Sequence, residues 1–424
     1  MKYLFSLTLV FSFLFGYSQN QALKNIDYTY LDNIKSVRFH IQGLMTSLPM
    51  VNLGSSTKLL LSFDDFDEDV KNYTYTIIHC NQDWTPSDLA EMEYIDGFTE
   101  EQILDYRFSF KAITDYTHFE LSLPNDDMSW TKSGNYLLIV YEDEEERIPA
   151  ITRRFMVVDQ QVNILPQMVR PAKVSKMRTH QEIDFTVNTK KLQVRSPRQE
   201  ISATVLQNGR WDNALTNIPP IFERPKEIVF DYQDKIIFPA GNEFRFMDLR
   251  SLRRPFDRVA ELQEYEDRFD VYLTKDEKRL NRPHSLIQDL NGNYVIENFD
   301  QVDDPNLTGN YANVWFFLYS PDKLFDYDVY LFGAFSEWQL RPELKMEYNP
   351  AVNSYVGKAF LKQGFYDYTY AVVKRQGEDK KPKLAEIEGN WFEANNQYTI
   401  LIYYRPFGSR YDQLIGKSGF SSSL

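Results

Sequence analysis

Acidic residues cluster in the segment FDDFDEDVKNY, where carboxylates at alternate positions suggest a calcium-binding loop. Counted from Asp65, carboxylates occupy positions one, three and five of such a loop. Position six is Val70, where the loop needs glycine for its sharp turn, and position twelve is Thr76, where a bidentate Glu is needed. The segment therefore predicts an acidic loop at a strand end, and no metal site.

A histidine and a cysteine stand next to each other at His79 and Cys80, and this pair could be a base and its nucleophile. Neighbours along a strand point to opposite faces, so the imidazole cannot act as the base for the thiol. The chain also lacks the glycine-rich phosphate loops, the Gly-x-Ser-x-Gly elbow and the His-Glu-x-x-His zinc motif. A pair of glycosidase carboxylates cannot be recognised from sequence among 61 acidic residues. We therefore expect no enzymatic activity, metal or cofactor. A hydrolase ranks third, and last, among the hypotheses for the function.

Charge limits the partners of the chain. With 47 basic and 61 acidic residues its net charge is −14, which disfavours binding to nucleic acid or to anionic lipid. Against this background a basic cluster stands out as a candidate partner contact: Arg250, Arg253, Arg254 and Arg258. The competing interpretation is that the cluster pairs with nearby carboxylates, namely Asp248, Asp257 and Glu261.

The chain opens with the pattern of a secretory signal peptide. Lys2 precedes an apolar run over residues 3–15, and the small residues Gly16 and Ser18 predict cleavage after Ser18. We expect an exported protein without direct membrane insertion. Its single cysteine allows no disulfide within the chain.

Apolar residues alternate from end to end, which predicts strands rather than helices. SGNYLLIVYED is apolar on both faces, as expected for a central strand. The best helical candidate, or else a short turn, is residues 88–106, and residues 166–178 are expected to form a linker. The length suggests about three domains, which we place at 19–165, 166–305 and 306–424 after the signal peptide (1–18). The predicted fold class is all-β, with three consecutive Ig-like β-sandwich domains.

A specific string in the first domain resembles the plug protein family of the Bacteroidetes type IX secretion system. The resemblance is strongest over residues 30–158, and later segments fit more loosely. The string comprises His79-Cys80, Asp83-Trp84, Ser87-Asp88-Leu89, Glu93-Tyr94, Asp96-Gly97, Pro124 and Ser133-Gly134-Asn135-Tyr136.

The resemblance implies a noncatalytic periplasmic protein. It would bind the outer-membrane translocon β-barrel as a monomeric subunit and block the periplasmic opening when no substrate is passing. The resemblance supplies no contact residues, so the arginine cluster remains the candidate contact.

The last domain resembles early-set sandwiches that include glycogen-binding modules. DVYLFGAFSEWQL places Trp338 where those modules carry a sugar-stacking Trp, and Trp391 is the candidate second ring. The turn that usually supplies the second ring reads KRQGEDKKPK, with charges in its place. The alternative function is therefore a periplasmic or surface glycan-binding protein, while the favoured interpretation is that Trp338 closes one end of the sandwich or joins an interface.

Overall fold

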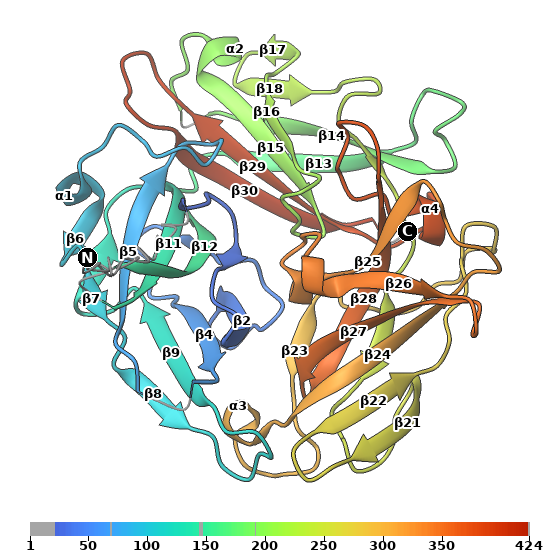
Figure 1. Ribbon diagram of the computed structural model, residues 1–424. Coiled ribbons are helices and arrows are strands. Elements are labelled where there is room, and N and C mark those ends of the chain that lie inside the picture. Colours follow the sequence, from blue (N-terminus) through green and yellow to red (C-terminus); the bar gives the residue numbers. More distant parts are fainter. Residues whose placement is uncertain (1–21, 68–69, 144–146, 191, 423–424) are drawn as a thin grey trace, which may run out of the picture.

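The chain folds into three β-rich lobes (Figure 1). The computed structural model describes residues 22–67, 70–143, 147–190 and 192–422, so the expected signal peptide lies outside the described residues. The described α-helices are single turns: α1 (Glu91–Tyr94), α2 (Pro197–Glu200), α3 (Pro305–Thr308) and α4 (Ala385–Glu388). The predicted all-β class is confirmed. In these four ranges, no helix has the length and apolar character needed to span a membrane.

Lobe 1 is a sandwich of two sheets. One sheet contains β1 (Tyr28–Thr29), β3 (Met50–Asn52), β5 (Tyr73–Cys80), β7 (Glu101–Gln102), β11 (Gly134–Glu142) and β12 (Ile148–Val158). The other has the order β2 (Ile34–Ile41), β4 (Leu59–Asp65), β9 (Thr117–Leu123) and β8 (Asp105–Phe108). A small hairpin joins β6 (Ile95–Gly97) to β10 (Met128–Trp130).

Lobe 2 pairs strands from two distant parts of the chain. Its first sheet contains β13 (Asn163–Val169), β14 (His180–Asn188), β17 (Phe222–Arg224), β18 (Glu227–Phe230) and β19 (Ile237–Pro239). Its second sheet joins β15 (Ile201–Gln207) and β16 (Leu215–Ile218) to β29 (Gln397–Tyr404) and β30 (Gln413–Ser421). The last two strands of the chain therefore complete the middle lobe.

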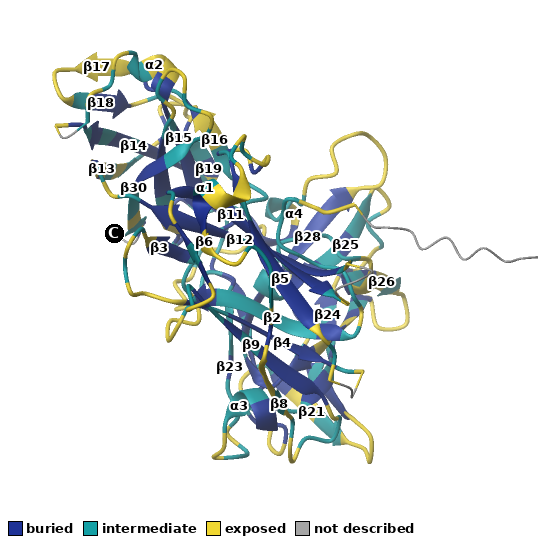
Figure 2. Cartoon of the chain, turned by 90° about the vertical axis from the view of Figure 1, so that its left-hand side faces the viewer, coloured by how far each residue is buried: buried dark blue, intermediate teal, exposed yellow. Residues whose placement is uncertain are grey.

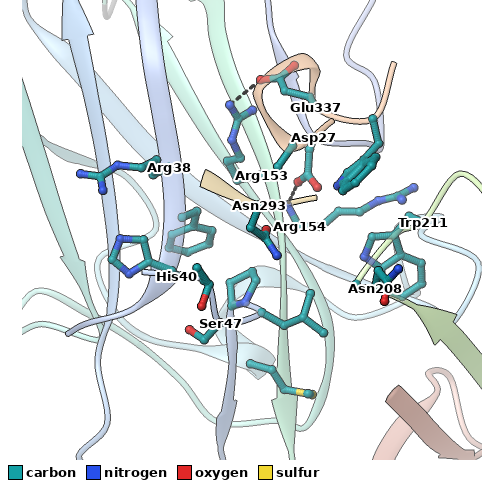
Figure 3. A pocket seen from close by; sticks show the side chains of 18 of the residues that line it. Asp27, Arg38, His40, Ser47, Arg153, Arg154, Asn208, Trp211, Asn293 and Glu337 are labelled. Atoms are coloured by element: carbon teal, nitrogen blue, oxygen red, sulfur yellow. Dashed lines mark hydrogen bonds and ion pairs between the residues drawn. The ribbon is translucent and has the colours of Figure 1, made fainter. Parts of the chain in front are cut away.

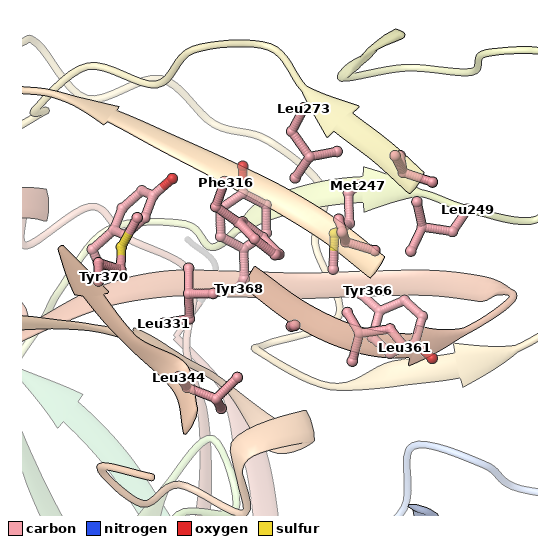
Figure 4. Packing of buried hydrophobic residues seen from close by; sticks show 14 of the residues in the cluster. Met247, Leu249, Leu273, Phe316, Leu331, Leu344, Leu361, Tyr366, Tyr368 and Tyr370 are labelled. Atoms are coloured by element: carbon pink, nitrogen blue, oxygen red, sulfur yellow. The ribbon is translucent and has the colours of Figure 1, made fainter. Parts of the chain in front are cut away.

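Lobe 3 is built on one long, curled sheet around the cluster of side chains in Figure 4. The sheet contains β20 (Arg245–Asp248), β21 (Val259–Glu264), β22 (Phe269–Leu273), β23 (Tyr294–Ile296), β24 (Tyr311–Tyr319), β25 (Tyr327–Phe332), β26 (Lys345–Asn349), β27 (Ser354–Lys362) and β28 (Gly364–Lys374). Three tyrosines of β28, at positions 366, 368 and 370, are at most 1% exposed and fill this core.

The packing differs from the domain boundary expected at residue 306. Strand β20 pairs with β28 and β22 pairs with β24, so residues 245–273 share the core of lobe 3. Conversely, β15 pairs with β29, which brings residues 397–404 into lobe 2. The reason is that strands far apart in sequence can pair, and alternation along one segment does not specify its neighbour.

Two local predictions can be compared with the structure as well. Of the two alternatives for residues 88–106, the short turn agrees with the structure, which has one turn, α1, followed by the short strands β6 and β7 and the start of β8. The expected linker at 166–178 begins inside β13, where Pro166 lies in an edge strand and so leaves no sheet hydrogen bond unmade.

Strand β11 is buried on both faces, as the sequence predicts (Figure 2). Tyr136, Leu138 and Val140 point into the core of lobe 1. Leu137 and Ile139 point the other way and pack against β15, β29 and β30 of lobe 2. A continuous hydrophobic core therefore joins lobes 1 and 2, and an apolar interface of this kind holds two lobes in a fixed orientation.

Candidate functional site at the junction of the three lobes

The three lobes meet around a cavity of about 570 Å³ (Figure 3). Each lobe contributes polar or aromatic side chains to its wall. They include Arg38, His40 and Arg153 from lobe 1, Asn208 and Trp211 from lobe 2, and Asn293, Glu337 and Trp338 from lobe 3. The cavity thus exists only in the assembled molecule.

One wall of the cavity is an ionic bridge between lobes 1 and 3. Arg153 donates from Nη2 to Glu337 Oε1 at 2.5 Å, and Thr29 donates from Oγ1 to the same oxygen at 2.6 Å. Arg341 pairs with the other carboxylate oxygen. Burial alone raises the pKa of Glu337, but the charges of Arg153 and Arg341 outweigh it and lower the pKa. The carboxylate is therefore ionised and holds the two lobes together.

A second wall offers a hydrogen-bond acceptor. His40 is 4% exposed, and its Nδ1 lies 2.9 Å from the carbonyl oxygen of Ile41, so Nδ1 carries the proton. Burial lowers the pKa of His40, which keeps the ring neutral. Its Nε2 and the Oδ1 of Asn291 are buried without a partner in the described part of the chain. Both line the cavity and can accept hydrogen bonds from a small polar molecule or from water.

Three carboxylates line the cavity: Asp27, Asp212 and Glu337. Glu337 and Asp212 are engaged in ion pairs, and Asp27 accepts from the backbone N–H of Arg154 at 2.6 Å. The imidazole of His40 bonds to the carbonyl of Ile41. Within the residues that the structure describes, no three His, Cys, Asp or Glu side chains gather closely enough to hold a metal ion. The Arg153–Glu337 pair holds lobes 1 and 3 in one orientation.

Trp338 lies in the wall of this cavity with its ring covered. The indole is edge-on to Phe244 at 5.8 Å and to Phe332 at 5.5 Å. The Arg210 guanidinium lies 4.8 Å from the ring centroid, and a Cβ added to Gly292 would come within 2.3 Å of the indole. Sugar stacking needs an open aromatic face, so this placement favours the interpretation that Trp338 closes the end of the sandwich.

Trp391, the candidate second ring, does not line the cavity. Its backbone N–H donates to the carbonyl of Gly241 at 2.9 Å, and its indole Nε1 packs 3.3 Å from a Cβ position at Gly389. The structure therefore does not bring the two tryptophans together on one binding face of this cavity.

Two members of the basic cluster are engaged within lobe 3. Arg250 pairs with Asp248 at 2.7 Å and with Glu297 at 3.2 Å. Arg258 pairs with Asp276. These contacts agree with the competing interpretation of the cluster, except that Arg258 uses a carboxylate 18 residues away and not Asp257.

The other two members remain available. Arg253 and Arg254 are exposed, and neither has a carboxylate within 4.0 Å in the described ranges. Arg254 lies over the ring of Phe256 at 5.4 Å. These two side chains stay candidates for contact with a partner.

Two of the residues that carry the family resemblance, His79 and Asn135, contact lobe 2 at the seam between lobes 1 and 2. His79 Nδ1 lies 2.9 Å from Ser87 Oγ, and its Nε2 lies 3.2 Å from the carbonyl of Ser133. A Cβ at Gly134, whose φ is +147°, would come within 2.4 Å of that Nε2, so only glycine fits. Asn135 Oδ1 accepts from the Tyr403 hydroxyl at 2.8 Å across the seam. The motif is therefore structural.

The thiol of Cys80 is expected to be inert in the folded protein. It is 1% exposed, and burial raises its pKa to about 12, so thiolate is scarce at neutral pH. A maleimide reagent should label less than about one tenth of the native chain in an hour at pH 7.5, and all of it in denaturant. Rapid native labelling would contradict this prediction.

Asp367 gives the fold a predicted pH dependence. Its Oδ2 accepts from the amides of Leu290 and Gly292, and burial and then the Asp289 carboxylate raise its pKa to about 7. In the unfolded chain this carboxyl ionises near pH 4. Its contribution to the free energy of unfolding is therefore fully present below that pH and is lost as the pH rises through about 7. Relative to wild type, the free energy of unfolding of Asp367→Asn should therefore rise by about 1 kcal/mol or more between pH 4 and pH 8. Denaturant titrations of both proteins at the two pH values measure this change. The prediction fails if the difference between variant and wild type is the same at both pH values.

Sequence reasoning missed two buried ionic clusters. One joins Asp64 of lobe 1 to Lys362 of lobe 3, and the other joins Arg245 to Asp276 and Glu388 inside lobe 3. Lys362 lies on the face of β27 that carries the exposed Lys358 and Phe360, opposite the lobe 3 core, so its own strand gives no signal that it is buried. Its partner, 298 residues away, has no signature in the sequence.

Comparison with known proteins agrees with this architecture. Residues 34–159 match the type 9 secretion system plug protein first domain. The crystal structure of a hypothetical protein from Parabacteroides merdae aligns with a TM-score of 0.89 at 32% identity, covering 94% of this chain and 100% of that chain. A search of curated proteins finds no match.

The fold defines a three-lobed β protein whose first lobe matches a plug domain. Residues 34–159 therefore belong to the family of type 9 secretion system plug protein first domains, as the sequence indicated.

Proposed function

We propose that this chain is a noncatalytic periplasmic subunit that binds the outer-membrane translocon barrel of the type IX secretion system. It closes the periplasmic opening when no substrate is passing. The observation that carries the proposal is the match of residues 34–159 to the plug domain. The chain would act as a single copy without a cofactor, and would reach the outer membrane through its protein partner.

The packing supports this role physically. A stopper must keep its shape against a wide opening, and separate domains joined by flexible linkers would not. Here a hydrophobic core joins lobes 1 and 2, and the Arg153–Glu337 pair and the Asp64–Lys362 pair join lobes 1 and 3. Interfaces of this kind resist relative motion of the lobes.

Affinity purification from native outer membranes tests the proposal. A tagged chain isolated in mild detergent should carry the translocon barrel with it, and the same material should pass through immobilised starch or glycogen without retention. Retention on a glycan, with no barrel recovered, would support the glycan-binding alternative and contradict the plug assignment.

Deletion of the gene provides a second test. Cells lacking the chain should admit antibiotics or dyes that the intact outer membrane excludes, because the translocon opening would be uncovered. Re-expression should restore exclusion. Unchanged permeability together with unchanged type IX export would contradict the proposed function.

A further inference from the structure

Three ionisable side chains stand side by side on neighbouring strands of lobe 1. In the sheet β2-β4-β9-β8, His118 of β9 is the register partner of both Asp64 on β4 and Arg107 on β8. Successive residues of a strand point to opposite faces, and Phe63 and Phe119, the chain neighbours of Asp64 and His118, fill the core of lobe 1. The three ionisable side chains therefore share the face that is turned away from this core.

Ion pairs at both ends of this row cross to lobe 3. Lys362 donates from Nζ to Asp64 Oδ2 at 2.6 Å, and Arg107 donates from Nη1 to Asp304 Oδ2 at 3.0 Å. The side chains of Asp64 and Lys362 are each 1% exposed, so the first pair is fully buried. His118 lies between the two crossings and connects them.

Both ring nitrogens of His118 face carboxylate oxygens. Its Nδ1 lies 2.5 Å from Asp64 Oδ1, and its Nε2 lies 3.3 Å from Glu120 Oε1. An ionised carboxylate only accepts hydrogen bonds, and a neutral imidazole carries a single N–H. A neutral ring, 3% exposed here, would therefore turn a nitrogen lone pair toward one of the two carboxylates. Only the imidazolium, which has two N–H groups, satisfies both contacts.

The proton on His118 also balances the charge of the row. Glu120 pairs with Arg107 at 3.2 Å, which closes the connection between the two crossings. The order along the row is Lys362, Asp64, His118, Glu120, Arg107 and Asp304. With His118 protonated, three cations alternate with three carboxylates. Without that proton, two cations face three carboxylates, and the uncompensated charge is costly where the lobes exclude water.

The surroundings of His118 favour the protonated ring. Burial alone lowers the pKa of His118, but its hydrogen bonds to Asp64 and then to Glu120 outweigh burial and raise the pKa. The two groups in direct contact with the ring are both carboxylates. In the described part of the chain, the charged and titratable side chains on the elements around His118 are Asp64 (β4), Glu120 (β9), Arg107 (β8), Arg38 (β2), Lys362 (β27), Tyr311 (β24), and Asp304 and Tyr116 in adjoining loops.

We propose that His118 is an imidazolium that holds lobe 3 against lobe 1, and that loss of its proton at alkaline pH loosens this contact. Separation of the lobes would let water solvate Asp64 and Glu120, so the missing charge penalises the docked state more than the open one. The contribution of His118 to docking is fully present below its ordinary pKa of about 6.5 and is lost as the pH rises through the raised value. The lock belongs to the chain alone and does not depend on a partner.

Other titratable groups in the row have to be separated from His118. Tyr116 and Tyr311 stay neutral, because burial raises the pKa of both hydroxyls. Lys362 is the group that could also lose its proton, since burial lowers its pKa. The titration of His118 must therefore be observed directly.

Nuclear magnetic resonance of the untagged mature chain provides that observation. The sequence has five histidines, so labelling their Cε1 atoms with ¹³C gives a small set of signals, and His118→Gln identifies one of them. The signal of His118 should titrate above about pH 6.5. The matched control is His180 of lobe 2, which has no carboxylate within 4.0 Å in the described ranges and whose pKa burial lowers. A midpoint for His118 at or below that of His180 would overturn the proposal.

Hydrogen exchange measures the contact between the lobes. The backbone N–H of Phe110 donates to the Leu307 carbonyl at 3.0 Å, and that of Ile113 donates to Asn310 Oδ1 at 2.7 Å, so both amides report on docking. After correction for intrinsic exchange, protection of residues 109–114 should fall at least about tenfold between pH 6.5 and pH 9.5, the worth of one charge-assisted hydrogen bond. Protection of β11, in the core shared by lobes 1 and 2, should change less than about twofold.

Two variants separate His118 from the other groups. His118→Gln should show low protection of residues 109–114 already at pH 6.5 and little further fall, whereas His180→Gln should behave like wild type. An equal fall in His118→Gln and wild type would assign the effect to another group, such as Lys362, and overturn the proposal. If His118→Gln does not fold, wild type still decides: the fall in protection must have the same midpoint as a histidine signal that titrates above pH 6.5. Constant protection, or a different midpoint, refutes the lock.

Discussion

Replacing Lys362 with methionine is expected to lower the free energy of unfolding by about 3–5 kcal/mol. Lys362 is 1% exposed, and its ammonium lies 2.6 Å from Asp64 Oδ2 and 2.6 Å from the carbonyl oxygen of Asn306. Asp64 is fully buried in lobe 1 and also contacts His118 at 2.5 Å. Burial alone raises the pKa of Asp64, but the charges of Lys362 and His118 outweigh it and lower the pKa to about 2.

Loss of the ammonium would leave a buried carboxylate with only part of its compensation, which is the costly case for an ion pair. The double variant Asp64→Asn/Lys362→Met should recover part of the loss, because neither charge then remains. Lys111→Met is the matched control: Lys111 also pairs across lobes 1 and 3, with Asp303, but it is 54% exposed. That control should cost less than about 1 kcal/mol.

Denaturant-induced unfolding, followed by tryptophan fluorescence, measures these differences. Equal effects of Lys362→Met and Lys111→Met would contradict the prediction, since burial would then make no difference. Because the pair joins two lobes, the Lys362 variant should also expose the interface to hydrogen exchange around α3 before the rest of the chain unfolds.

The second large effect is expected within lobe 3. Arg245 is 9% exposed and donates to Asp276 Oδ1 at 2.8 Å and to both oxygens of Glu388 at 3.0 Å. The hydroxyls of Tyr368 and Tyr370 donate to Asp276 Oδ2 at 2.7 Å each. Arg245→Met would leave two buried carboxylates short of charge compensation, and we expect a loss of about 3–5 kcal/mol.

The control for this prediction is Arg282→Met. Arg282 pairs with Glu277 beside the same cluster, but both side chains are more than half exposed. Exposed pairs contribute about 0–1 kcal/mol, so the control should unfold like wild type. If Arg245→Met unfolds at the same denaturant concentration as Arg282→Met, the buried cluster is not the source of stability that we infer.

Several features of the fold could be predicted from local pattern. Alternation of apolar residues predicts strands such as β5 and β24, since a pleated strand places successive side chains on opposite faces. The run of apolar residues in β11 predicts a strand covered on both sides, and the structure identifies the second cover as lobe 2. The string around His79 and Gly134 indicated the plug-domain family. The His79 ring lies so close to Gly134 that only glycine fits there, and a steric requirement of this kind fixes the residue type in the sequence.

The candidate site could not be predicted in the same way. The Arg153–Glu337 bridge joins residues 184 positions apart, and the Asp64–Lys362 pair joins residues 298 apart. Such contacts depend on how lobes dock, and a charged residue has the same local signature whether it is paired or solvated. Trp338 matched a sugar-binding pattern, but Arg210, a residue of another lobe, covers its ring.

By itself the sequence determined the class of structure, the strands with strong alternation and the family of the first domain, because these depend on periodicity and on short-range steric constraints. The tertiary structure alone decided that β29 and β30 complete lobe 2, that three lobes line one cavity, and that Tyr106 and Phe108 of β8 stay exposed. The physical reason is that strand pairing and lobe docking are chosen by the free energy of burying complementary faces, and that free energy belongs to pairs of distant segments and not to either segment alone.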